Sequence, residues 1–384
     1  MTQARAAEIP ALTGVRIVAA VWVVIEHFRN VIYGLLPSVR SAHVYIEGGY
    51  LGVEVFFVLS GFIISHNYAD RFASFSTRAY RKFLRNRFAR LYPVHLVTLA
   101  IVALLVSGAA LFHVALNSDG RYEPTGFVMN ILMLQGIPPA RAWNGPAWSI
   151  SAEAGVYILF PLVALLIARV RTRVGLVLGA AAALTVTIAG ELAIEATSGF
   201  DPTGYPSIWV RVVGEFLTGC FVWALWRKLD LSKRKYDALA VAGVGGTVLV
   251  LALSRDLSAA NYFILPFVAI FIFACAGAAG PVRRFLSSQP IKYGGRISYS
   301  LYMTHFIVLM VGGKLLPWER FSGASLPVRG AIVVAYFLAA FAVAALVYHI
   351  VEEPGRRMIG RYRGRRRARH VLAEARQSEP AGER

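Results

Sequence analysis

Apolar residues along this chain of 384 residues gather into ten blocks. Each block is close to the ~20 residues that a helix needs to cross a hydrocarbon core, and short polar stretches rich in arginine separate the blocks. The pattern predicts an all-α polytopic membrane protein with about ten transmembrane helices. The predicted spans are residues 15–35, 50–68, 91–112, 148–168, 174–194, 207–226, 237–254, 262–280, 297–313 and 330–350.

The composition supports a membrane domain. The chain is 57% hydrophobic and only 16% charged, with a mean hydropathy of +0.56, whereas a typical soluble domain is about 25% charged. This balance excludes disorder and disfavours an ordinary soluble fold. Cys220 and Cys275 both fall inside predicted spans, so neither a disulfide framework nor a metal site of the usual spacing is expected.

The distribution of basic residues predicts the orientation. If the N-terminus is cytoplasmic, 31 of the 40 Lys and Arg lie on the inner side and eight on the outer side, while Arg211 lies within a span. The positive-inside rule therefore predicts that both termini are cytoplasmic and that the protein crosses the plasma (inner) membrane several times.

The net charge of +19 is explained by the same loops, because cytoplasmic basic segments are attracted to anionic lipid. A nucleic-acid partner is not needed to account for it. We divide the chain into a transmembrane domain, residues 1–353, and a polybasic cytoplasmic tail, residues 354–384, whose expected role is adhesion to anionic lipid. The long outer loop, about 113–147, is amphipathic and predicts a helix at the membrane interface.

The first predicted span carries two candidate functional residues, Arg16 and His27. Eleven residues advance a helix by roughly 1100° and about 16 Å, so the two side chains share one face. Ionisable groups at such depth usually face the bundle interior. His27 is a candidate general base, and Arg16 either faces the interior or extends to the inner headgroups. Because this block also carries Glu26, it predicts a permanent helix rather than a cleaved signal peptide.

Two carboxylates are predicted at a similar depth. Glu54 lies about 6 Å and His27 about 9 Å from the outer boundary if both helices are regular, so we expect the two to pair. The alternative is that Glu54 bonds to backbone groups near Gly48, Gly49 or Gly52. Glu153, five residues after Trp148, is expected in the same layer.

The inner loop before the third span is unusually basic. Retention of the loop on the inner side explains three or four of these residues, and the excess indicates a phosphate-rich ligand, which arginine binds bidentately. No Walker A or dinucleotide glycine motif accompanies the cluster, so a nucleotide is expected only as the handle of a group donor. The cluster comprises Arg78, Arg81, Lys82, Arg85, Arg87 and Arg90.

His305 is expected near the middle of the ninth span, where a core histidine is the favoured interpretation. Glu352 and Glu353 end the last span, where pairing with nearby arginines is expected.

Taken together, the motifs resemble the acyltransferase 3 family, the membrane-bound O-acyltransferases that modify surface polysaccharides and some antibiotics. Six segments occur in the family's order, namely LTGVRIVAAVWVVIEH with its Arg-x10-His spacing, GGYLGVEVFFVLSGFII, RNRFARLYP, WSISAE, SYSLYMTH and YHIVEEPGRR. This chain has Ala154 and Gly155 where a glutamate and a glutamine are common, and Thr304 where a tryptophan is usual.

The resemblance implies transfer of an acyl group, usually acetyl, from cytoplasmic acyl-coenzyme A to a hydroxyl, with no metal. It implies that His27 is the base, that Arg16 and the Arg87-x-x-Arg90 pair bind the coenzyme A end, and that Glu54 and Glu153 occupy the family's acidic positions. We expect Arg85, in the same basic cluster, to bind coenzyme A with them. The expected acceptor is a carbohydrate or another glycosylated molecule, either a cell-envelope polysaccharide or a small macrolide-type metabolite. A transporter or flippase remains the competing class, because buried charges also occur there.

Overall fold

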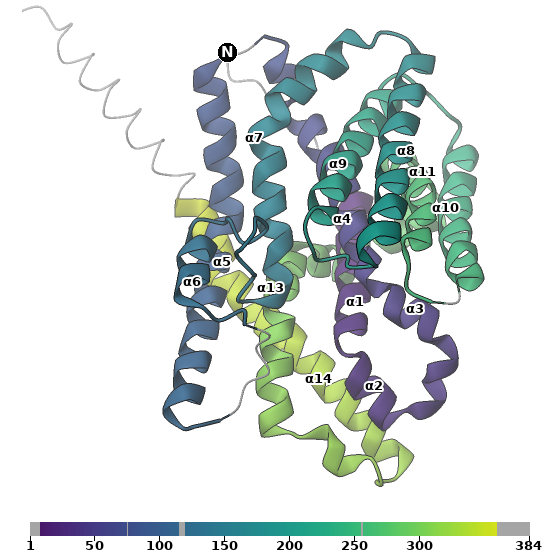
Figure 1. Ribbon diagram of the computed structural model, residues 1–384. Helices are drawn as coiled ribbons and strands as arrows, with labels where there is room; N and C mark the ends of the chain where they lie inside the picture. The colour runs from purple at the N-terminus through teal and green to yellow at the C-terminus, as the bar shows by residue number, and fades with distance from the viewer. Residues whose placement is uncertain (1–7, 75, 115–119, 255, 359–384) are drawn as a thin grey trace, which may run out of the picture.

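The computed structural model describes residues 8–74, 76–114, 120–254 and 256–358, and within them it contains helices and short helical turns but no strands (Figure 1). The long helices are α1 (Pro10–His27), α4 (Gly52–Tyr68), α5 (Thr77–Leu111), α7 (Trp148–Arg169), α8 (Arg173–Ser198), α9 (Ser207–Trp226), α10 (Lys233–Leu253), α11 (Leu265–Gly277), α13 (Gln289–Leu315) and α14 (Leu326–Val347). The shorter ones are α2 (Arg29–Leu35), α3 (His43–Glu47), α6 (Pro124–Ile131) and α12 (Pro281–Leu286).

The predicted fold class is confirmed. Nine helical segments in the described part of the chain are long and apolar enough to cross a membrane. The ninth predicted span, residues 297–313, is not among these nine, although α13 covers it with a helix of 27 residues. The orientation of the termini stays a prediction.

The bounds of the first predicted span are wrong. Helix α1 begins at Pro10 and ends at His27, and the backbone leaves the helical region at Phe28, with φ −88° and ψ 5°. The short helix α2 then begins at Arg29. The prediction is wrong because the apolar pattern continues through this turn, whereas the helix ends before it. His27 is therefore the last residue of its helix.

The basic stretch before the third predicted span is helical, and the prediction of a loop there is wrong. Helix α5 runs for 35 residues from Thr77 to Leu111 and includes Pro93. The side chain of Ser76 accepts a hydrogen bond from the backbone N–H of Ala79, which caps the first turn. The basic residues are thus held in fixed angular positions on one helix.

The helices form one bundle in which α1 lies near the centre (Figure 1). Helix α1 packs against α4 and α13, and α13 packs against α14. On the other side, α9 packs against α4 and α8, and α10 packs against α11. Large apolar side chains on the outward faces are exposed, as expected for surfaces that contact lipid; examples are Leu104, Leu178, Val186, Val241 and Leu338.

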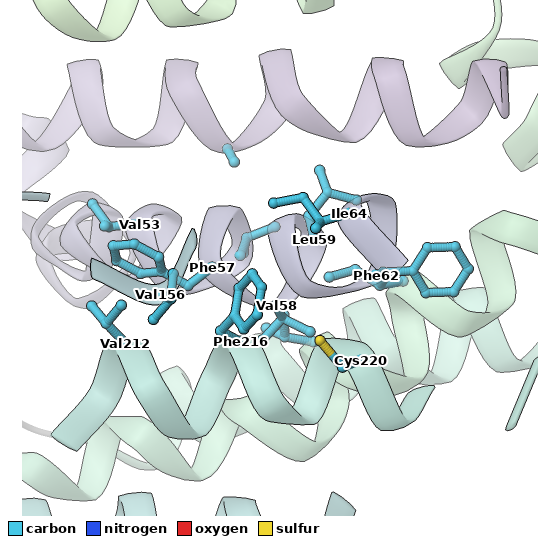
Figure 2. Close-up of a cluster of buried hydrophobic side chains, with 14 of the residues drawn as sticks. Val53, Phe57, Val58, Leu59, Phe62, Ile64, Val156, Val212, Phe216 and Cys220 are labelled. Carbon is cyan, nitrogen blue, oxygen red and sulfur yellow. The ribbon is translucent and has the colours of Figure 1, made fainter. Parts of the chain in front are cut away.

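The contact between α4 and α9 contains much of the largest apolar cluster (Figure 2). Val58, Phe62 and Phe216 are at most 1% exposed. Gly61 and Gly219 permit the close approach, because a Cβ at Gly61 would collide with the carbonyl oxygen of Phe216, and one at Gly219 with that of Val58. Small residues at helix contacts are the usual means of close packing in membranes.

The predicted interface helix in the outer loop corresponds to α6. The proposed boundary at residues 353 and 354 falls inside a helical stretch that continues to Met358. Most of the predicted tail, residues 359–384, lies outside the described residues.

Candidate active site

A cavity within the bundle brings together four of the candidate residues. Arg16 comes from α1, Arg87 and Arg90 from α5, and Glu153 from α7. The cavity has a volume of about 100 Å³, several times the ~10–15 Å³ that one water molecule requires. The remaining wall is mostly apolar and aromatic, and it includes side chains of α4 and α13.

The polar groups of the cavity are held in place by neighbours. The Nη2 of Arg87 donates to the Tyr68 hydroxyl at 3.2 Å, and the guanidinium lies 5.1 Å from the centre of the Tyr68 ring. Glu153 accepts hydrogen bonds from the hydroxyls of Tyr157 and of Ser60, the latter at 3.4 Å. With three arginines and one carboxylate on its wall, the cavity favours an anionic ligand.

His27 does not line this cavity and is not paired with Glu54. Its Nδ1 lies 2.8 Å from Glu26 Oε2 and 3.0 Å from the carbonyl oxygen of Val23. Two acceptors at Nδ1 place the proton there in the neutral ring, so Nε2 keeps its lone pair. Glu26 also forms an ion pair with Arg29. The carboxylate that orients His27 is therefore its sequence neighbour.

His305 connects His27 to the cavity wall. Its ring centre lies 4.8 Å from that of His27, in an edge-to-face arrangement, and 6.0 Å from that of Tyr302. Tyr302 lines the cavity. The His305 ring is fully buried, its Nδ1 donates to the carbonyl of Leu301 at 3.1 Å, and its Nε2 has no partner. His305 is thus a core histidine, as predicted, but it has one unused nitrogen beside the candidate base.

Glu54 belongs to a different cluster. It forms a buried ion pair with Arg211 of α9, and Glu191 lies 3.9 Å from the Arg211 Nε. The carboxyl of Glu215 is fully buried beside that of Glu54. The Arg211 guanidinium also lies 5.4 Å from the centre of the Trp148 ring. The predicted pairing of Glu54 with His27 is wrong, because Glu54 meets its counterion on α9.

His27, Glu54 and Glu153 therefore each have different partners, and their common depth stays a prediction. His27 contacts Glu26, Glu54 contacts Arg211, and Glu153 lies with the cavity arginines. Arg85 is also separated from Arg87 and Arg90, because it lines a second hollow on α5. The pairing argument failed because it used depth alone and did not fix which helix faces which.

Sequence reasoning missed four polar residues, Glu26, Glu191, Arg211 and Glu215. Arg211 and Glu215 lie four residues apart within an apolar span, a spacing that places them on one helix face. Ionisable residues at such positions mark functional or structural polar clusters. The sequence therefore contained a signal for this polar cluster. The described residues contain no group of three or more histidine, cysteine or acidic side chains that would hold a metal ion.

Comparison with known proteins gives relatives over most of the chain. The profile of the acyltransferase domain family matches residues 9–349. The acyltransferase MdmB of Streptomyces mycarofaciens is 29% identical, over 94% of this chain and 94% of that protein. The O-acetyltransferase OatA of Staphylococcus aureus is 24% identical, over 79% of this chain and 51% of OatA.

The peptidoglycan O-acetyltransferase OatA of Listeria monocytogenes is also 24% identical, over 80% of this chain and 50% of that protein. This chain therefore spans about half the length of the OatA proteins and nearly the whole of MdmB. No solved structure matches the chain. Because the family profile covers nearly all of the transmembrane bundle, the chain belongs to the acyltransferase 3 family.

Proposed function

We propose that this protein is an integral membrane O-acyltransferase that moves an acyl group, acetyl in the simplest case, from acyl-coenzyme A to a hydroxyl of a carbohydrate or glycosylated acceptor. The observation that carries the proposal is the cavity with Arg16, Arg87 and Arg90 on its wall, connected through Tyr302 and His305 to His27. Membership of an acyltransferase family supplies the reaction class.

The arginines of the cavity attract the anionic end of the donor, and its thioester extends from there along the apolar wall toward His27. Arginine is suited to this role because its planar guanidinium bonds phosphate oxygens bidentately. We assign the arginine end of the cavity to the cytoplasmic side on the basis of the predicted orientation of the termini. Glu153, held by Tyr157 and Ser60, positions groups within the cavity rather than acting on His27.

His27 acts as the general base through Nε2. It takes the proton of the acceptor hydroxyl as that oxygen attacks the thioester carbonyl. The new C–O bond forms, the C–S bond breaks, and the proton finally reaches the departing thiolate, so that coenzyme A leaves as a thiol. Glu26 holds the Nδ1 proton and stabilises the imidazolium. The ring of His305 contacts that of His27, and its Nε2 has no hydrogen-bond partner.

The acceptor is proposed from chemistry and from relatives. One relative is named a peptidoglycan O-acetyltransferase, which favours a glycan hydroxyl. The chain covers only about half of that protein, so the acceptor class is tested directly. A small macrolide-type glycoside is the second acceptor that the same chemistry would serve.

The function is tested with purified protein in liposomes, supplied with acetyl-coenzyme A labelled in the acetyl group. Peptidoglycan fragments and a macrolide glycoside are offered as acceptors in parallel. We expect an alkali-labile labelled ester on one of them. Movement of an acceptor across the membrane without ester formation would instead establish a transporter and overturn the proposal.

Replacing both Arg87 and Arg90 with glutamine is expected to raise the KM for acetyl-coenzyme A by about tenfold or more, because hydrogen bonds to charged groups are worth ~1.5–3 kcal/mol each. The matched control replaces Arg283 and Arg284, two exposed arginines on α12, and should leave KM unchanged. An unchanged KM in the α5 variant would mean that the donor does not bind in this cavity.

Replacing Glu26 with glutamine is expected to lower kcat by about 10- to 100-fold, because the amide no longer stabilises the imidazolium of His27. The affinity for the donor should not change, since Glu26 does not line the cavity. Glu54→Gln serves as the comparison, since Glu54 bonds Arg211 and should affect stability more than kcat. A loss of kcat only in the Glu54 variant would restore the pairing with His27.

A further inference from the structure

A second hollow lies on the first turns of α5. It is lined by Thr77, Arg78, Arg81, Lys82 and Arg85 and has a volume of about 500 Å³. Arg78, Arg81 and Lys82 are exposed, and Arg85 is half-buried. The hollow therefore presents four cationic side chains and one hydroxyl to the same space, with no carboxylate on its wall.

The cations of the hollow are not neutralised. In the part of the chain that the structure describes, none of the four forms an ion pair, and the buried Nε of Arg85 has no hydrogen-bond partner. By contrast, Arg227, just after α9, pairs with Asp70 at 2.7 Å. Within the described residues, the four cations therefore have no carboxylate counterion.

The hollow and the donor cavity lie on opposite sides of α5. At 100° per residue, the four basic residues of the hollow fall within an arc of about 100°, whereas Arg87 and Arg90 point roughly 120–180° away from Arg78. The six basic residues of this helix therefore serve two separate spaces. Only Arg87 and Arg90 line the donor cavity.

The hollow also lies outside the hydrocarbon core. Helix α5 has 35 residues and is about 52 Å long, whereas the core is ~30 Å thick. Its apolar part is at the C-terminal end, residues 94–111. At ~1.5 Å per residue, the first turns lie about 13–25 Å before this apolar part, at and beyond the headgroups. Figure 1 shows α5 at the edge of the bundle with α7 on its inner side.

We propose that Thr77, Arg78, Arg81, Lys82 and Arg85 form a phosphate-binding site, distinct from the donor cavity, that takes a phosphate ester at the membrane surface. Arginine binds phosphate bidentately, and the first turn of a helix adds free backbone N–H groups and a favourable dipole. Two molecules at this surface carry such a group, an anionic phospholipid and the nucleotide end of coenzyme A. The position at the bundle edge, opposite the cavity, favours the phospholipid.

The test uses the full chain in nanodiscs, with Arg78, Arg81 and Lys82 replaced together by glutamine. The matched control replaces Lys233, Arg234 and Lys235 with glutamine. These residues are exposed at the start of α10, and their replacement removes the same amount of charge. Arg85→Gln alone is a second, milder variant. Thermal unfolding, followed by reaction of the buried thiols of Cys220 and Cys275, confirms that each variant is folded.

Two quantities are measured: the phosphatidylglycerol retained after exchange into phosphatidylcholine, and the affinity for coenzyme A in phosphatidylcholine alone. We expect retained phosphatidylglycerol to fall by about tenfold or more in the α5 variant and not in the control. If the affinity for coenzyme A falls instead, the phosphate site is kept, but its ligand is the donor and not the phospholipid. This second outcome rests on the proposed function. Wild-type values for both quantities, or an equal loss in the control, would overturn the site whether or not the protein transfers acyl groups.

Discussion

Replacing His27 with glutamine is expected to lower kcat for acyl transfer by about 10²- to 10⁴-fold, the range that a general base contributes. Glutamine keeps a polar side chain at the end of α1 but cannot take a proton at neutral pH. The affinity for acetyl-coenzyme A should stay at the wild-type value, because His27 does not line the cavity. Steady-state ester formation and equilibrium binding of the donor give the two quantities separately.

His43→Gln is the control for this variant. His43 begins α3, bonds the carbonyl of Arg40 at 3.2 Å and is not part of the cavity, so its replacement should leave kcat unchanged. If His27→Gln weakened donor binding and left kcat intact, His27 would be a binding residue. The assignment of a base at the end of α1 would then be wrong.

Replacing Arg211 with methionine is expected to lower the free energy of unfolding by about 3–5 kcal/mol, because it leaves a buried carboxylate without its counterion. Arg211 is 1% exposed, and both Glu54 and Glu215 are fully buried beside it. Thermal unfolding is followed by the accessibility of Cys220 and Cys275, which are 0% and 1% exposed in the folded chain.

Arg227→Met provides the comparison for Arg211. Arg227 pairs with Asp70 at 2.7 Å, but these side chains are 49% and 70% exposed, and exposed pairs are worth only about 0–1 kcal/mol. Its unfolding midpoint should therefore stay near that of the wild type. Equal midpoints for the two variants would show that Glu54 and Glu215 do not depend on Arg211.

The helical fold could be predicted because crossing a bilayer requires long apolar helices, and those leave a pattern in the sequence. The sixth predicted span, residues 207–226, has the bounds of α9. The ends of the helices were harder to predict. At Phe28 the chain leaves the helix within an apolar stretch, and at Thr77 a helix begins within a basic stretch, so hydropathy placed neither end correctly.

The candidate site could be predicted in part. Arg16, Arg87 and Arg90 share the cavity, which follows from ionisable residues facing inward, whereas Glu153 was expected beside His27 and Glu54 and lies with these arginines instead. The partners of His27 and Glu54 could not be predicted from the sequence, because the depth of a residue in the membrane does not show which helices are neighbours. Glu54 faces α9 through the close contact at Gly61 and Gly219, and this packing is a property of the folded bundle.

The central claim, acyl transfer from coenzyme A with His27 as base, is tested most directly by measuring the released thiol and the ester product together in one reaction. For reconstituted wild-type protein, we predict one coenzyme A thiol for each ester formed, with both lost to a similar extent in His27→Gln. Ester formed without thiol release would mean that another molecule is the donor. Thiol and ester released at the wild-type rate by His27→Gln would contradict the role of His27.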